Sequence, residues 1–438
     1  MLALLRKNKG ALSYMSVLVA DRITGLILIY FLIRYSSSEN FSFWTQVHFL
    51  PGAVCGILGL GFGRGILRIF VDNNISQKVV SLAIYLSSFT YLLICILAYL
   101  LILYIDNSSV NRFMGGESNT YLGILMLSIF IVLEGFFEIL LNFLRAKISH
   151  SFVFFSALRI IPRVIAVLSI VAFEVDFWFS IYIYILGSTV IISQLFFTVS
   201  KTIKDKHPRK DLDSKEFNTL IKKLSRYSIP VMISAIAFPV LNIFVREYVI
   251  QVDGYDQLGV FAIYMSFIGM IIYFPEAFQN YIFPKLVSMK NKSKDKDKDK
   301  DKEKRNILKQ LRYVMIFSAF SCLVFVFIGP YLLDIIYPKT VWTSIDSFSI
   351  AITAFFWTFY FTMQRIYLIY FPLKTEFLTY ITFISCALAL TLVYAELISG
   401  PLNAVLGVMI FYLVSLLLII ILFKKNHFFC NINNKNLI

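Results

Sequence analysis

Several charged residues of this chain stand inside long apolar stretches, where an ionisable side chain is costly and normally faces the protein interior or a wet cavity. Glu134 and Glu138 are four residues apart, as are Arg159 and Arg163, so each pair lies on one face of a helix. Such side chains either hold two helices together as ion pairs or bind a charged substrate or a coupling ion. The sequence leaves both interpretations open.

The depths of these four residues can be compared if their helices are antiparallel neighbours. The connection near residues 145–151 joins the two stretches. At 1.5 Å per helical residue, Glu138 and Arg159 each lie about 10 to 12 Å from this connection. Glu134 and Arg163 each lie about 16 to 18 Å from it. We therefore predict two ion pairs, Glu138 with Arg159 and Glu134 with Arg163.

Asp21 and Arg22 stand near the middle of the first apolar stretch. A guanidinium group at that depth is a natural partner for phosphate oxygens, to which it can donate two hydrogen bonds at once. A pair between Arg22 and an acidic neighbour such as Asp21 is the alternative. We include both residues among the candidates for a binding site.

Four more charged residues complete the candidate set. Glu276 lies inside an apolar stretch, beside Pro275. Arg246, Glu247 and Arg365 lie nearer the ends of their stretches. At a helix end, a long side chain can reach the membrane surface while its stem stays in the apolar layer, which explains such residues without a binding site.

The sequence contains no motif of a known catalytic or metal site. We find no nucleotide-binding loop or dinucleotide fingerprint, no HExxH zinc motif and no ordered set of nucleophile and base. The five cysteines are scattered, and four of them lie in apolar runs, so we expect neither a disulfide framework nor a metal site. We predict no catalytic residues, no cofactor and no enzymatic activity.

The elements that position these residues must cross a membrane. Hydrophobic residues make up 58% of the 438 residues and charged residues only 15%, which is too apolar for an ordinary water-soluble globule. Helices of about 20 apolar residues span the hydrocarbon layer. The sequence predicts an all-α polytopic membrane protein of about twelve helices, at approximately 11–34, 43–63, 79–105, 121–144, 151–173, 177–200, 228–250, 257–284, 312–336, 345–371, 374–398 and 400–423.

Lysine and arginine gather in every second connection between these helices. By the positive-inside rule, those connections and both termini are cytoplasmic. This topology accounts for the formal charge of +15, so we expect no nucleic-acid partner. The basic N-terminal residues are not followed by a cleavage site, so we expect the first helix to be retained.

A charged segment at 201–227 divides the predicted helices into six before it and six after it. We therefore predict two six-helix bundles, 1–200 and 228–438, in parallel topology, as in transporters whose two bundles face a central cavity. Residues of about 285–311 include the alternating sequence KDKDKDKDKEK. Because such low-complexity sequence cannot bury a core, we predict a solvated cytoplasmic loop there.

Short motifs at four places support a resemblance to a known family. In order along the chain they are Gly59-Leu-Gly61-Phe-Gly63-Arg64-Gly65-Ile-Leu-Arg68, Leu144-Arg145-Ala-Lys147 followed by Arg159 and Arg163, Ser228-Ile-Pro230, and Leu258-Gly259-Val-Phe-Ala-Ile-Tyr264-Met-Ser266. In this order and spacing, with twelve predicted helices, the chain resembles the Wzx-type O-antigen and polysaccharide repeat-unit flippases of the multidrug/oligosaccharidyl-lipid/polysaccharide exporter superfamily.

The resemblance implies a V-shaped pair of bundles in the bacterial inner membrane. It implies alternating-access transport of an undecaprenyl-diphosphate-linked oligosaccharide from the cytoplasmic to the periplasmic leaflet. Membrane lipid, and the polymerase and chain-length machinery of the same pathway, are the further partners that it implies. The product is O-antigen or a related surface polysaccharide of the kind found in lipopolysaccharide.

The resemblance also assigns roles to the charged residues. A diphosphate needs a cavity that carries cations, for which the candidates are Arg22, Arg159, Arg163, Arg246 and Arg365. Relatives are driven by an ion gradient, H⁺ or Na⁺, and the candidates for coupling or ion pairs are Asp21, Glu134, Glu138, Glu247 and Glu276. The sequence Val245-Arg246-Glu247 departs from the family, since many relatives have an Asp-Arg pair there.

Two alternative functions are kept. A multidrug or cation antiporter of the same superfamily would share the fold, but we would expect its cavity to be more apolar and acidic. An O-antigen polymerase is also polytopic and acts on the same lipid-linked sugar. It usually carries a large periplasmic loop with catalytic arginines, whereas the connections predicted to be periplasmic are short here.

Overall fold

A computed structural model describes most of the chain, namely residues 9–37, 40–41, 43–46, 89, 92–93, 96, 99–100, 120–146, 150–173, 176–206, 214–292, 297–338, 340–370, 376–396 and 400–425. Within these ranges the regular structure is entirely α-helical, which confirms the predicted fold class. The helices of the first half are α2 (Lys9–Tyr35), α7 (Thr120–Ala146), α8 (His150–Leu158), α9 (Ile160–Phe173) and α10 (Phe177–Lys206). Those of the second half are α11 (Ser214–Lys292), α12 (Asp297–Ile336), α13 (Ser344–Tyr370), α14 (Glu376–Tyr394) and α15 (Pro401–Lys425).

The chain is a polytopic membrane protein. Eight of the described helical stretches are long and apolar enough to cross a membrane, and they cover 122–144, 151–173, 177–202, 236–273, 312–336, 344–368, 377–394 and 401–424. The first predicted span corresponds to α2. The spans predicted at 43–63 and 79–105 lie largely outside the described residues.

The predicted fifth span is broken into α8 and α9 at Arg159. Pro162 explains the break, since proline lacks the N–H that would bond to the carbonyl of Leu158 and its ring collides with that carbonyl. On the other side of Pro162, α10 packs closely because Gly187 has no side chain. A Cβ atom at Gly187 would lie only 2.9 Å from Cβ of Pro162.

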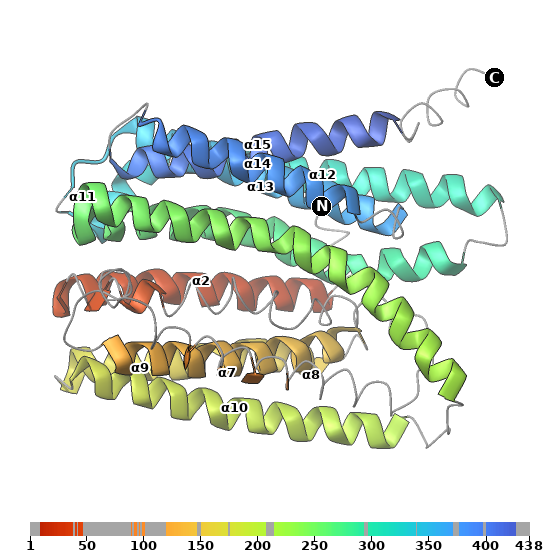
Figure 1. Ribbon diagram of the computed structural model, residues 1–438, viewed down its shortest axis with the longest axis horizontal. Coiled ribbons are helices and arrows are strands. Elements are labelled where there is room, and N and C mark those ends of the chain that lie inside the picture. The colour runs from red at the N-terminus through yellow and green to blue at the C-terminus, as the bar shows by residue number, and fades with distance from the viewer. Residues whose placement is uncertain are drawn as a thin grey trace.

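α11 combines two predicted spans and changes direction at Gly254 (Figure 1). Gly254 has φ of 84° and ψ of −178°, a left-handed conformation that glycine adopts without steric cost. The sequence predicts a connection between 250 and 257, and the structure places the turn there. We call this part of the molecule, where α2 ends and α11 turns, the Gly254 end.

The predicted cytoplasmic loop at 285–311 is helical over most of its length. α11 continues to Lys292 and α12 begins at Asp297, so the prediction of a loop is wrong for these residues. Each piece continues a membrane helix, and extending a helix costs far less than starting one.

The segment at 201–227 is also helical where it is described. α10 runs to Lys206, and α11 begins at Ser214.

The described helices form two groups, one from each half of the chain, and α2 lies between them (Figure 1). α7 to α10 lie on one side of α2, and α12 to α15 with most of α11 lie on the other, while the beginning of α11 runs toward the end of α10. The apolar side chains of Ile29 and Ile33 on α2 pack against the hydrophobic cores of both groups. α2 therefore belongs to the first half but also forms part of its contact with the second.

Candidate functional site

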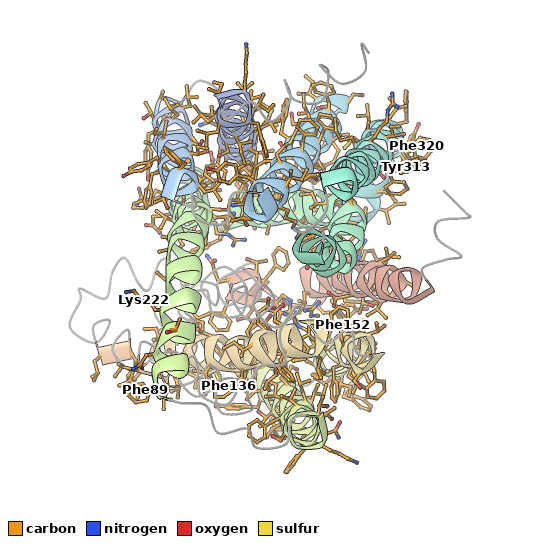
Figure 2. All side chains as sticks on the ribbon, turned by 90° about the vertical axis from the view of Figure 1, so that its right-hand side faces the viewer. Phe89, Phe136, Phe152, Lys222, Tyr313 and Phe320 are labelled. Carbon is orange, nitrogen blue, oxygen red and sulfur yellow. The ribbon has the colours of Figure 1, made fainter. Side chains whose placement is uncertain are left out.

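A cavity with a volume of about 410 Å³ lies between the two groups of helices. Figure 2 shows the molecule along the direction of its helices, with the two groups above and below this region. The first half contributes residues of α2, α9 and the segment 43–46, and the second half contributes residues of α11 and α13. The charged side chains that line the cavity are Asp21, Arg163, Arg246 and Glu276.

Asp21 and Arg163 form an ion pair on the wall that belongs to the first half. Nη1 of Arg163 donates a hydrogen bond of 3.0 Å to Oδ1 of Asp21, which joins α9 to α2. Both side chains are mostly buried, with 12% and 13% of their surfaces exposed. Nε of Arg163 is buried and has no hydrogen-bond partner among the described residues, so this guanidinium retains a donor for a further group.

Arg246 is almost fully buried, with 2% of its surface exposed. Its Nε donates to Oδ1 of Asn242, one turn earlier on α11, at 3.1 Å. Its Nη1 donates to Oε1 of Gln46 at 3.1 Å and lies 3.4 Å from Oγ1 of Thr45. Arg246 therefore does not extend to the membrane surface. It lines the cavity and contacts both halves of the protein.

Glu276 and Arg365 form a looser ion pair within the second half, with 3.5 Å between Oε1 and Nη2. Glu276 lines the cavity from α11, and Arg365 of α13 pairs with Glu276. Glu247 is not among the lining residues, and it accepts a hydrogen bond of 2.8 Å from Gln251 on its own helix.

Aromatic side chains form part of the cavity wall in the second half, which the sequence analysis missed. Phe238 and Trp357 both line the cavity, with 4.9 Å between their ring centroids. Behind them, Tyr412 stacks on Trp357 at 4.6 Å. Aromatic residues make up 17% of the sequence, so composition alone could not single these out.

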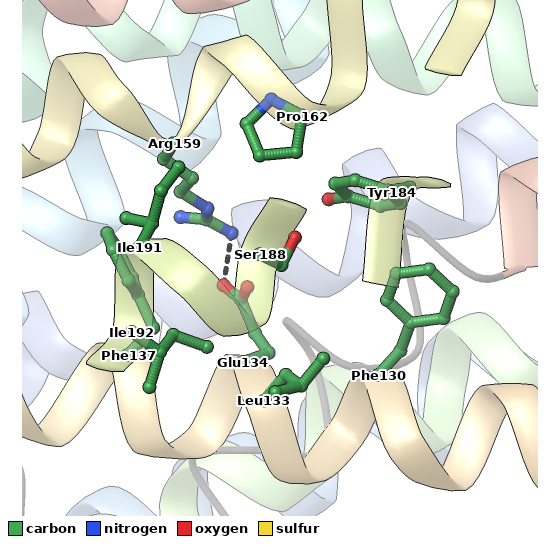
Figure 3. Close-up of a pocket in the computed structure, with 10 residues that line it drawn as sticks. All are labelled: Phe130, Leu133, Glu134, Phe137, Arg159, Pro162, Tyr184, Ser188, Ile191 and Ile192. Carbon is green, nitrogen blue, oxygen red and sulfur yellow. Dashed lines mark hydrogen bonds and ion pairs between the residues drawn. The ribbon is translucent and has the colours of Figure 1, made fainter. Parts of the chain in front are cut away.

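A second, much smaller pocket of about 40 Å³ lies inside the first half. Arg159 donates a hydrogen bond to Glu134 across it, and the hydroxyls of Tyr184 and Ser188 point toward it (Figure 3). A water molecule needs at least about 10 to 15 Å³ of such space, so the pocket has room for a few waters and none for a large substrate.

The predicted pairing of these residues is wrong. Arg159 pairs with Glu134, and Arg163 pairs with Asp21. The prediction assumed an unbroken fifth helix, whereas the structure interrupts it at Arg159. Glu138, the predicted partner of Arg159, is exposed and accepts a hydrogen bond of 3.0 Å from Asn142.

The side chain of Arg22 lies outside the described part of the structure, although its backbone belongs to α2.

Across the described residues, no three His, Cys, Asp or Glu side chains are grouped as they would be around a metal ion. Cys322 and Cys386 are free thiols, and both are buried.

No known protein family matches the chain by its sequence profile, and no curated protein matches it. Solved structures of MATE transporters share its fold. The MATE structure in complex with MaL6 has a TM-score of 0.68 at 14% identity, over 95% of each chain. A MATE transporter of Vibrio cholerae has a TM-score of 0.67 at 13% identity, over 97% of each chain.

A third solved structure is a MOP superfamily transporter of Pyrococcus furiosus, described by the reverse polarity of its binding pocket, which suggests a different function. It has a TM-score of 0.70 at 13% identity, over 95% of this chain and 94% of that chain. The likeness to all three covers almost the full length of the chain. It establishes the fold as that of MATE transporters, an all-α membrane protein of two helical bundles.

Proposed function

We propose that the chain is an alternating-access membrane transporter whose substrate binds in the cavity between the two halves. The observation that carries this proposal is the cavity itself, which is lined by both halves and carries four charged side chains. A site at the junction of two bundles becomes accessible from either side of a membrane when the bundles rock against each other. The fold, shared with solved transporters, favours transport over the polymerase alternative.

The first candidate substrates are amphipathic organic cations. A protein of this fold that transports them would be a multidrug antiporter. One structure of the same fold is described as a multidrug resistance transporter. Phe238 and Trp357 offer aromatic faces to a cation, and Asp21 and Glu276 offer carboxylates. An H⁺ or Na⁺ gradient would supply the energy, with Glu134 or Asp21 as a group able to take up the ion.

The second candidate is a lipid-linked anion, as the resemblance to Wzx-type flippases implies. Arg163 and Arg246 favour it, because both residues line the cavity and guanidinium groups suit phosphate oxygens. The substrate would be an oligosaccharide on undecaprenyl diphosphate in the bacterial inner membrane. The aromatic faces of Phe238 and Trp357 would then pack against sugar rings.

Transport by the purified protein in liposomes separates the two candidates. One set of vesicles contains a fluorescent polyprenyl-diphosphate sugar, and reduction by external dithionite reports how much of it reaches the outer leaflet. A second set reports efflux of ethidium, an amphipathic cation, under an imposed H⁺ or Na⁺ gradient.

The two assays have distinct outcomes. Complete reduction of the lipid probe without ethidium efflux assigns the flippase, and the reverse result assigns the antiporter. Arg312→Gln, at an exposed position on α12, is the matched control for variants of the cavity arginines. If the protein moves neither probe under any gradient, the transporter proposal is wrong.

A further inference from the structure

Arg246 lies both in the wall of the cavity and at the contact between the two halves. Arg246 is among the residues that line the cavity. It also donates to Gln46 at 3.1 Å and contacts Thr45 at 3.4 Å, both from the first half of the chain. Asn242, its other hydrogen-bond partner, lies on its own helix. The bonds to Thr45 and Gln46 therefore depend on the two halves staying together.

At the same end of the molecule, further residues of the two halves are in contact. Phe41 of the first half lies so close to Gly259 of α11 that a Cβ atom there would be 3.1 Å from its ring. Ser36 and Tyr255 line opposite sides of a narrow space of about 30 Å³ at this contact. Opening of the Gly254 end separates these contacts.

Separation of the two halves has a specific cost at Arg246. A buried guanidinium that loses hydrogen-bond acceptors is destabilised, and opening removes the acceptors Thr45 and Gln46 while Asn242 remains. An anionic group in the cavity can replace them, and it supplies the counter-charge that these neutral acceptors lack. An anion therefore reduces the cost of opening, whereas a cation does not.

We propose that Arg246 is a substrate-sensitive latch that couples occupation of the cavity by an anionic group to opening of the Gly254 end. This inference rests on the proposed transport function and adds a regulatory step to it. Arg246 acts as a positioning residue, because it holds α11 against the segment that carries Gln46 until a substrate anion takes the place of Gln46. A ligand shifts such an equilibrium only by its difference in affinity for the two states.

The distance between the halves at the Gly254 end tests this inference. Phe173 and Val252 lie at this end on opposite halves, and both are exposed. Spin labels at Phe173→Cys and Val252→Cys, in full-length protein whose five native cysteines are replaced by serine, report the closed and open populations in lipid nanodiscs.

Two substitutions of Gln46 should act in opposite directions. Gln46→Ala removes the main bond across the contact and should raise the ratio of open to closed protein about tenfold. Gln46→Glu places a carboxylate against Arg246 and should lower that ratio. Glu247→Gln, whose bond to Gln251 stays within α11, is the control and should leave the ratio unchanged. If Gln46→Ala and Gln46→Glu change the ratio of open to closed protein in the same direction and to the same extent, the latch is overturned. Damage to packing alone would act in this way, because it does not depend on the charge of the new side chain.

Ligands provide the second test, with a dialkyl phosphate and a quaternary ammonium of equal chain length as probes. The phosphate should raise the open population of the wild-type protein but not that of Arg246→Gln, and the ammonium should raise neither. If the phosphate binds by equilibrium dialysis without changing the distance distribution, the coupling is wrong while a transport function still stands. If neither probe binds and neither is transported, the proposed function fails, and the Gln46 variants still decide whether the latch exists.

Discussion

Arg163 and Asp21 form an ion pair between α9 and α2, with 3.0 Å between Nη1 and Oδ1. This pair connects the first bundle to a helix whose Ile29 and Ile33 also pack against the second core. The charged wall of the cavity and the contact between the two halves therefore share one helix. A movement of α2 would change both at once, which is the coupling that alternating access requires.

Removing the carboxylate of this pair should destabilise the protein. Asp21→Asn leaves the mostly buried Arg163 guanidinium without a counter-charge, and we expect a loss of about 2 to 3 kcal/mol. Thermal unfolding can be followed with a thiol-reactive dye in protein whose Cys55, Cys95 and Cys430 are replaced by serine, since Cys322 and Cys386 are buried in the folded protein. The double variant Asp21→Asn with Arg163→Gln should recover part of the loss. Independent, additive losses would show that the two side chains do not interact.

Substitution of the two glutamates of α7 should change the unfolding temperature by different amounts, although the sequence predicts an ion pair for each of them. Glu134→Gln removes the partner of Arg159 inside the first bundle and should lower the unfolding temperature by several degrees. Glu138→Gln changes an exposed side chain and should have little effect. The same thermal assay compares the two variants. A larger effect at Glu138 would contradict the observed pairing.

Two glycines provide a test of helix packing. Gly187→Ala places a Cβ atom 2.9 Å from Pro162, and we expect a loss of about 1 to 3 kcal/mol as α10 is pushed from α9. At Gly25, the nearest atom to an added Cβ is 4.0 Å away, so Gly25→Ala should be neutral or stabilising. Denaturant unfolding in mild detergent measures both. Equal stability of the two variants would contradict the close approach of α9 and α10.

The aromatic rings that line the cavity, Phe238 and Trp357, should contribute to substrate binding. Trp357→Ala should weaken binding about tenfold, and Trp357→Phe should retain most of it because an aromatic face remains. Trp342, which packs against Tyr264 outside the cavity, provides the control Trp342→Phe. Equilibrium dialysis with the transported probe measures the affinity. Unchanged binding by Trp357→Ala would place the substrate elsewhere.

The sequence was sufficient to predict the fold class and the position of most described helices. Long apolar stretches are a strong signal, because a helix is the simplest way to satisfy backbone groups in lipid. The helical extensions beyond the membrane were missed, since the alternating charges around Asp297 were interpreted as low complexity. The break at Arg159 was missed too, although Pro162 is a signal from which it could have been predicted.

The candidate site was only partly predictable. Charged residues in apolar stretches led to Asp21, Arg163, Arg246 and Glu276, which the structure brings to one cavity. Their partners depend on which helices are neighbours, and a sequence without its fold does not supply that information. Gln46 and Thr45 carry no sequence signal at all, because neutral polar residues near a helix end are common.

A reversible cross-link at the Gly254 end tests the central claim, that transport requires the two halves to separate there. Phe41 and Gly259 lie in contact across the two halves. In protein with Phe41→Cys and Gly259→Cys and no other cysteine, a short cleavable bis-thiosulfonate reagent joins these positions, and transport in liposomes is measured before and after reduction. The account predicts that transport stops on cross-linking and returns on reduction, while either single-cysteine protein is unaffected. Transport that continues at full rate through the cross-linked protein would contradict it.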